Sequence, residues 1–146
     1  MTSKDLTKEP PRSPKALLGG YVILGRTLDK CRALLAGNIG EYHFDSPLDN
    51  VLLGWKRIAA DNLKAEVAKG ASDEEIVQWL DTHGRPKTDD EKQAWAEQVG
   101  KASFYNVPAK RDSFIIETTR LGLDPATTTL FDWLDADDKA SYPNAQ

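Results

Sequence analysis

Hydrophobic residues recur every three or four positions along most of this 146-residue chain, which is the spacing of an amphipathic helix. The first such stripe predicts a helix from about Pro14 to Ala36, with proline at its first turn and Gly37 at its end. The helix should lie at the centre of the fold. We expect four members of the stripe to be buried: Leu24, Leu28, Cys31 and Leu35.

Further helices are predicted from capping residues, prolines in the first turn and terminal glycines. Their starts are expected at Ser46-Pro47, Asp61, the capping boxes Ser72–Glu75 and Thr88–Glu91, Pro108, and Asp124-Pro125. Only residues 41–44 alternate as a strand would, and the loops are short. The predicted fold class is therefore all-α, a compact single-domain multi-helix bundle or an orthogonal helical array. The four tryptophans fall on four different predicted helices and should anchor the core.

Three regions are expected: an N-terminal arm (1–14), a helical domain (15–139) and a loose C-terminal tail (140–146). Pro10, Pro11 and Pro14 keep the arm irregular. The arm is either a disordered tail or a strap laid over the domain, and Leu6 together with the prolines favours the strap.

Charge and composition exclude several classes of protein. The formal net charge is −4 and there is no run of lysine and arginine, which argues against a nucleic-acid binder. A single cysteine excludes an internal disulfide. The first residues lack the apolar core of a signal peptide, and no apolar run approaches the ~18–20 residues of a membrane span. We expect a cytoplasmic protein that binds no membrane. No phosphate loop, zinc-finger spacing or nucleotide fingerprint is present, so no cofactor is predicted.

The segment from Gly37 to Asp49 holds the strongest candidate chemistry. Glu41, His43 and Asp45 occupy alternate positions, so an extended backbone would place them on one face. A histidine beside carboxylates can transfer protons or bind a metal ion. The same set can also be a loop histidine held by a neighbouring carboxylate. A metal site would need further ligands, and we predict none.

A second candidate lies on the first helix. Arg32 falls near the apolar stripe and Asp29 at its edge, one turn away. They form either a partly buried ion pair or the charged wall of a pocket. Arg26 and Lys30 are expected on the solvated edge of this helix. Arg32, Asp29, Tyr21, Asp49 and Arg12 make up the predicted substrate-binding set, and Arg12 could instead pair with a carboxylate of the domain.

Three separated motifs occur in order along the chain. They are residues 5–14 (DLTKEPPRSP), residues 40–49 (GEYHFDSPLD), and the pair 121–125 (LGLDP) with 131–135 (FDWLD). Together they resemble a bacterial family known as domain of unknown function 5069. The resemblance implies a small cytoplasmic helical domain and supplies no activity, cofactor or catalytic residue. It adds weight to Arg12, Glu41, His43 and Asp49, which lie inside the motifs.

Two functions are compatible with these residues. The first, which we favour, is an acid–base enzyme of lyase, isomerase or hydrolase type acting on a small molecule. Its pocket would lie between the first helix and the 37–49 loop, with His43 as acid or base and Glu41 or Asp45 orienting it. The alternative is a non-catalytic binding or protein-interaction module. Its surface would be the apolar arm or the acidic last helix, where Asp132, Asp135, Asp137 and Asp138 suggest a basic partner. A pocket lined by His43 and Asp29 would favour the enzyme. Neither substrate nor oligomeric state has a signal in the sequence.

Overall fold

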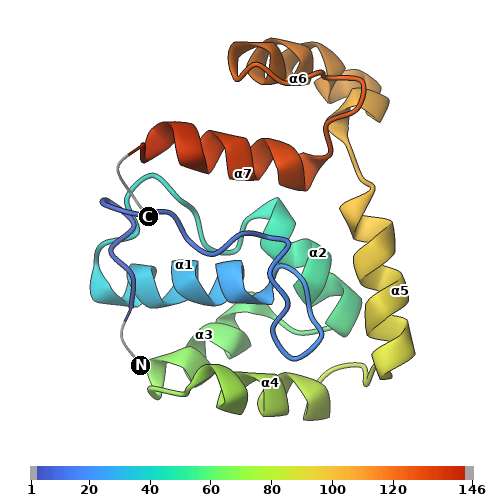
Figure 1. Ribbon diagram of the computed structural model, residues 1–146. Coiled ribbons are helices and arrows are strands. Elements are labelled where there is room, and N and C mark those ends of the chain that lie inside the picture. The colour runs from blue at the N-terminus through green and yellow to red at the C-terminus, as the bar shows by residue number, and fades with distance from the viewer. Residues whose placement is uncertain (1–2, 144–146) are drawn as a thin grey trace.

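The computed structural model describes residues 3–143, which are helical with no strand among them (Figure 1). This confirms the predicted all-α class. The α-helices and one 3₁₀-helix are α1 (Leu24–Ala36), α2 (Pro47–Lys56), α3 (Ala60–Ala68), α4 (Asp73–Thr82), α5 (Asp89–Gly100), η1 (Phe104–Asn106), α6 (Pro108–Arg120) and α7 (Leu130–Ser141). No helix in this part of the chain has both the length and the apolar character to cross a membrane.

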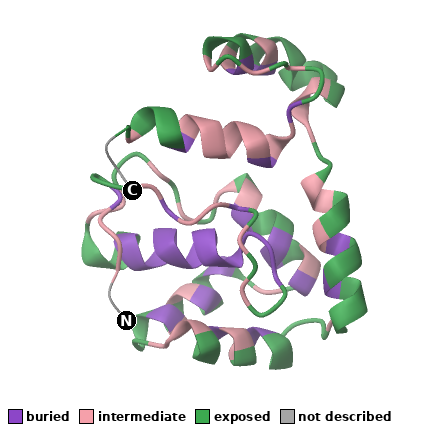
Figure 2. Ribbon diagram, in the orientation of Figure 1, coloured by how far each residue is buried: buried purple, intermediate pink, exposed green. Residues whose placement is uncertain are grey.

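Helix α1 lies at the centre of the molecule, as predicted. Helix α7 lies on one side of it, α3 and α4 on the opposite side, and α2 and α5 beyond the end at which α1 begins (Figure 1). Every residue from Leu24 to Ala33 is buried, so α1 is covered almost all round (Figure 2). A helix covered in this way is normally apolar, yet this one carries four charged residues in its buried part. Each of those charges must therefore find a partner inside the fold.

The start of α1 differs from the prediction. The helix begins at Leu24 rather than Pro14, because Gly19, Gly20 and Ile23 all have positive φ (59°, 83° and 73°). Such angles belong to left-handed turns, which interrupt a right-handed helix. Residues 14–23 therefore form a loop, in which the backbone N–H of Ile23 donates to the carbonyl oxygen of Pro14 at 2.9 Å.

Because residues 14–23 form a loop, the expected apolar stripe is buried only in part. Leu24, Leu28 and Cys31 are fully buried, as predicted. Leu35 is 44% exposed in the last turn, contrary to the prediction, because it lies beyond the part of α1 that its neighbours cover. Leu17 is 67% exposed because it belongs to the loop and not to the helix.

Most other helix starts follow the capping signals. The predicted capping boxes begin α4 and α5, and a third box begins α2, where Ser46 caps the helix as expected. Two predicted caps are wrong. Ala59 precedes α3, so Asp61 lies inside its first turn. Thr129 caps α7, whereas Asp124 belongs to the preceding turn and accepts from the backbone N–H of Ala126.

Aromatic side chains hold the flanking helices together. The four tryptophans lie on α2, α4, α5 and α7, one on each, as predicted. Trp55 stacks on Trp95 with ring centroids 4.2 Å apart. A separate cluster of Phe104, Phe114 and Trp133 joins η1 and α6 to α7. Helix α6 stands beyond α7, away from the central helix (Figure 1).

The N-terminal arm crosses between α1 and α7 (Figure 1). Leu6 is fully buried, and its backbone N–H donates to the carbonyl oxygen of Asn38 at 3.0 Å. The hydroxyl of Tyr142 donates to the carbonyl oxygen of Leu6 at 2.6 Å. Described residues 3–14 thus contact both the 37–46 loop and Tyr142, which follows α7. Helix α7 continues through Ser141 into the region predicted as a loose tail, and residues 1–2 and 144–146 lie outside the described residues.

Candidate functional site

Two cations of α1 are buried beneath α7 and the 37–46 loop. Arg26 and Lys30 are each only 4% exposed. Both were expected on a solvated edge, and that prediction is wrong because α7 and the loop cover this face of α1. Their spacing of four residues places them one turn apart on the same side of the helix.

Arg26 pairs with the carboxylate of Asp138 on α7. Its Nη1 lies 2.7 Å from Oδ2 and its Nη2 lies 3.4 Å from Oδ1. The Tyr42 hydroxyl donates to the same Oδ1 at 2.7 Å. Burial, together with this hydrogen bond to a carboxylate, raises the pKa of Tyr42. The phenol therefore stays protonated and serves as a hydrogen-bond donor from the loop to α7.

Lys30 joins α1 to the first turn of α2. Its Nζ lies 3.0 Å from Oδ1 of Asp49 and 3.1 Å from Oγ of Ser46. The Thr27 hydroxyl donates to Asp49 Oδ1 at 2.6 Å. Burial lowers the pKa of Lys30, and the negative charge of Asp49 acts in the opposite direction.

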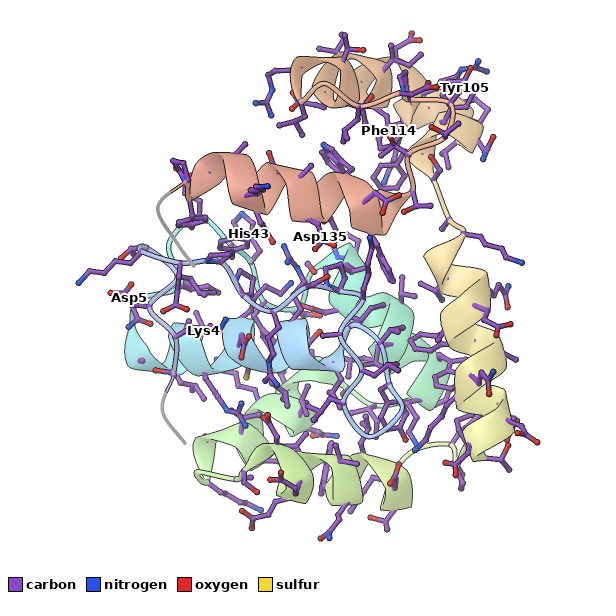
Figure 3. All side chains as sticks on the ribbon, in the orientation of Figure 1. Lys4, Asp5, His43, Tyr105, Phe114 and Asp135 are labelled. Carbon is purple, nitrogen blue, oxygen red and sulfur yellow. The ribbon has the colours of Figure 1, made fainter. Side chains whose placement is uncertain are left out.

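Arg26, Lys30 and Asp138 from these ion pairs border a cavity of about 320 Å³ between α1, the 37–46 loop and α7. His43 lies between the ribbons of α1 and α7 (Figure 3). The cavity is lined by Arg26, Lys30, Glu41, Tyr42, His43, Ser46, Leu134, Asp137, Asp138, Ser141 and Tyr142. A pocket therefore lies between the first helix and the 37–49 loop, with α7 as an additional wall, and it is lined by His43 but not by Asp29.

The three alternating residues of the loop do not all reach this cavity. Glu41 and His43 line it, whereas Asp45 does not. The chain is not extended here: a turn joins Tyr42 N–H to the carbonyl oxygen of Ile39, and Asp45 has φ 63°. The left-handed turn sends the Asp45 carboxylate to the side-chain amide of Asn50, 2.7 Å away.

Residues 8–140 match the family described as domain of unknown function (DUF5069). The chain belongs to this family. No curated protein matches it. The matched range includes the arm from Lys8, the whole 37–46 loop and α7 up to Ala140, so most of the cavity lies within the DUF5069 domain.

Asp29 and Arg32 of the DUF5069 chain lie outside this cavity and do not pair with each other. Arg12 binds Asp29, with Nη2 3.1 Å from Oδ1, and Asp73, with Nη1 2.9 Å from Oδ2. Arg32 Nη1 lies 2.7 Å from Asp73 Oδ1. The space that Gly25 leaves on α1 is occupied by the Arg12 guanidinium. These residues therefore form a structural network that joins the arm, α1 and α4.

Tyr21 and Asp49, which were both predicted to bind substrate, are fully buried and do not line the cavity. Tyr21 is fully buried against α4 and α5, where its hydroxyl donates to Asp81 Oδ1 at 2.6 Å and Lys92 Nζ lies 4.2 Å from its ring centroid. Burial raises the pKa of this phenol. Asp49 is fully buried behind the cavity, paired with Lys30.

Sequence reasoning missed several residues of the DUF5069 cavity. Ser46 was identified only as a helix cap, and Asp138 only as part of an acidic run. The shared spacing of Arg26 and Lys30 is the one local signal that could have linked these two cations. Among residues 3–143, no three side chains of the types His, Cys, Asp and Glu converge as metal ligands would.

Proposed function

We propose that this DUF5069 domain binds a small molecule in the cavity between α1, the 37–46 loop and α7, and that His43 acts on it as an acid–base group. One observation carries the proposal: two almost fully buried cations and an exposed imidazole border the same hollow. A purely structural ion pair needs no cavity beside it. Buried charges grouped around a cavity are instead typical of ligand sites.

His43 has the chemistry that proton transfer requires. Imidazole is the side chain that most readily changes charge between pH 5 and 8, so it can both accept and donate a proton. Within residues 3–143 its ring makes no hydrogen bond to another residue, and the side chain is exposed at the cavity. Glu41 in the same wall is better suited to orient the imidazole than Asp45, which is held by Asn50. A lyase, isomerase or hydrolase reaction fits these groups.

The interaction module is less well supported. The main argument for such a module was that the acidic last helix would need a basic partner. Cations of the same chain already contact that helix: Lys15 Nζ lies 2.6 Å from Asp132 and Arg120 Nη2 3.4 Å from Asp137. Together with the Arg26 pair, these contacts offset the acidic run from within the fold.

A ligand screen by thermal shift tests the proposal. A library of small polar metabolites is measured on the wild type, on His43→Gln and on His83→Gln. The control residue, His83, is exposed at the end of α4 and binds its own helix, with Nδ1 2.8 Å from the carbonyl oxygen of Trp79. Ligands should raise the melting temperatures of the wild type and the control by the same amount, because binding to the native state raises stability by mass action. The melting temperature of His43→Gln should rise less. If the library yields no ligand, or if every ligand acts equally on His43→Gln, the proposal is wrong.

A further inference from the structure

The side of the cavity formed by α1 and the start of α2, here called the floor, offers hydrogen-bond donors. The Ser46 Oγ already accepts from Lys30 Nζ at 3.1 Å and from the backbone N–H of Asp49 at 3.2 Å. A hydroxyl oxygen has two lone pairs, so the remaining valence of Ser46 is its own O–H. Lys30 has three N–H groups and directs them at two partners, which leaves one donor for a ligand.

The two carboxylates that pair with the buried cations, Asp49 behind the floor and Asp138 on α7, already accept hydrogen bonds. Asp49 accepts from Lys30 and Thr27 through Oδ1 and from the backbone N–H of Ser46 through Oδ2. Asp138 accepts from Arg26 and Tyr42. Two carboxylates thus balance the two cations, and a ligand that reaches the floor meets donors without a net negative charge. The group that satisfies such a floor is a carboxylate.

Two further carboxylates, Glu41 of the 37–46 loop and Asp137 of α7, also line the cavity and are here called the rim. Glu41 is exposed and forms no hydrogen bond or ion pair within residues 3–143. Among the described residues, the one ion pair of Asp137 on α7 is with Arg120, at 3.4 Å. Both carboxylates line the cavity, so the group that satisfies the rim is a cationic donor such as an ammonium.

We infer that the ligand is a small aminocarboxylic acid, whose carboxylate binds Lys30 and Ser46 and whose ammonium faces Glu41. This inference rests on the proposed function and names its class of ligand. The cavity of about 320 Å³ is at the low end of the ~300–1,000 Å³ typical of small-molecule sites, which suits a molecule of this size. His43 then lies in the same cavity as both ends of the zwitterion.

An NMR titration at neutral pH tests the inference with named probes. Glycine, β-alanine and 4-aminobutyrate are the zwitterions, and acetate and ethylammonium carry one charge each. At least one zwitterion should shift the His43 ring signals and the backbone amide signals of residues 41–46. It should bind about tenfold more tightly than either single-charge probe, because it uses both the floor and the rim; a factor of ten is about 1.4 kcal/mol.

Substitutions at Ser46 separate ligand binding from folding. Ser46→Asp keeps a good helix cap but places a carboxylate where the ligand carboxylate would bind, so zwitterion binding should fall at least about tenfold. Ser46→Thr keeps both the cap and the hydroxyl and should bind like the wild type. Ser72→Asp is the matched control, since Ser72 caps α4 with the same capping box outside the cavity. Glu41→Gln should reduce zwitterion affinity to that of acetate.

The outcomes distinguish this inference from the proposed function. Zwitterions that bind no better than acetate, or equal binding by Ser46→Asp and the wild type, would overturn the inference. If the metabolite screen still finds a ligand of other chemistry that depends on His43, the proposed function stands without it. If no ligand of any class acts through His43, both fail.

Discussion

Replacing Leu6 by alanine measures what the N-terminal arm contributes to stability. Leu6 is fully buried, whereas the hydrogen bonds at this position involve only its backbone N–H and carbonyl oxygen. The contacts to Asn38 and Tyr142 can therefore persist in Leu6→Ala. The substitution removes apolar side-chain packing alone, so its effect reports whether the arm is a strap or a loosely attached tail.

The expected magnitude follows from the carbons removed. Leu→Ala deletes three carbon atoms, worth about 2.4 kcal/mol at about 0.8 kcal/mol for each buried methylene. The cavity left behind adds to this, although an arm can relax into the space more readily than a helix. We expect the free energy of unfolding to fall by about 2–4 kcal/mol. That is a large fraction of the ~5–15 kcal/mol of a typical domain.

Urea denaturation followed by tryptophan fluorescence measures this difference. The midpoint should fall while the slope with denaturant stays unchanged, since the surface exposed on unfolding is nearly the same. Leu17→Ala is the control: Leu17 lies in the neighbouring loop, is 67% exposed, and should change stability by less than about 0.5 kcal/mol. If both variants have the same midpoint as the wild type, the arm does not contribute to the native state and our interpretation of its packing is refuted.

Three further predictions concern single residues. Burial raises the pKa of the Cys31 thiol to about 11, so at pH 8 a thiol reagent should modify native protein at least about 100-fold more slowly than unfolded protein; similar rates would contradict this. Burial of Asp73 opposes its ionisation, yet hydrogen bonds from two arginines hold its pKa below the ordinary value. Its stabilisation is therefore present above the unfolded pKa of ~3.9 and lost as pH falls through the folded pKa, so Asp73→Asn should flatten the acid side of the stability–pH curve measured by urea midpoints. Gly84 has φ +65° and no room for a Cβ beside the last carbonyl of α2, so Gly84→Ala should cost at least about 2 kcal/mol in the same assay, whereas Gly54→Ala, with open space around it, should not destabilise.

The fold could be predicted where the signal is local. A capping box needs only two residues three positions apart, and the boxes predicted at α4 and α5 are present. The start of α1 could not be predicted in this way. Leu17 and Tyr21 continue the helical spacing through a region that is a loop, and the turn at Gly19 is fixed by its close approach to Val77 on α4. Periodicity alone does not contain that distant contact.

The site could be predicted only in part, again because sequence patterns report local structure and not distant contacts. His43 and Glu41 could be found because they are chemically capable residues in a short loop. Arg26 and Lys30 could not, since cations on a helix are usually solvated and what buries Arg26 is α7, more than a hundred positions along the chain. The alternating spacing also led to the prediction of Asp45, which does not line the cavity. That spacing places side chains on one face only when the backbone is extended, and here the backbone turns.

The buried cations have a second role that limits how the site can be studied. Arg26 holds α7 and Lys30 holds α2 against α1, so the residues that border the cavity also connect the helices around it. Removing one partner of a buried ion pair costs about 3–5 kcal/mol, because the other charge stays buried without compensation. Loss of ligand binding in such a variant would therefore not distinguish a damaged site from a damaged fold. Ser46 and His43 avoid this difficulty: one can be exchanged for another helix cap, and the other forms no hydrogen bond within residues 3–143. Function in this domain is best tested at these two residues, because neither substitution removes a member of the Arg26–Asp138 or Lys30–Asp49 pair.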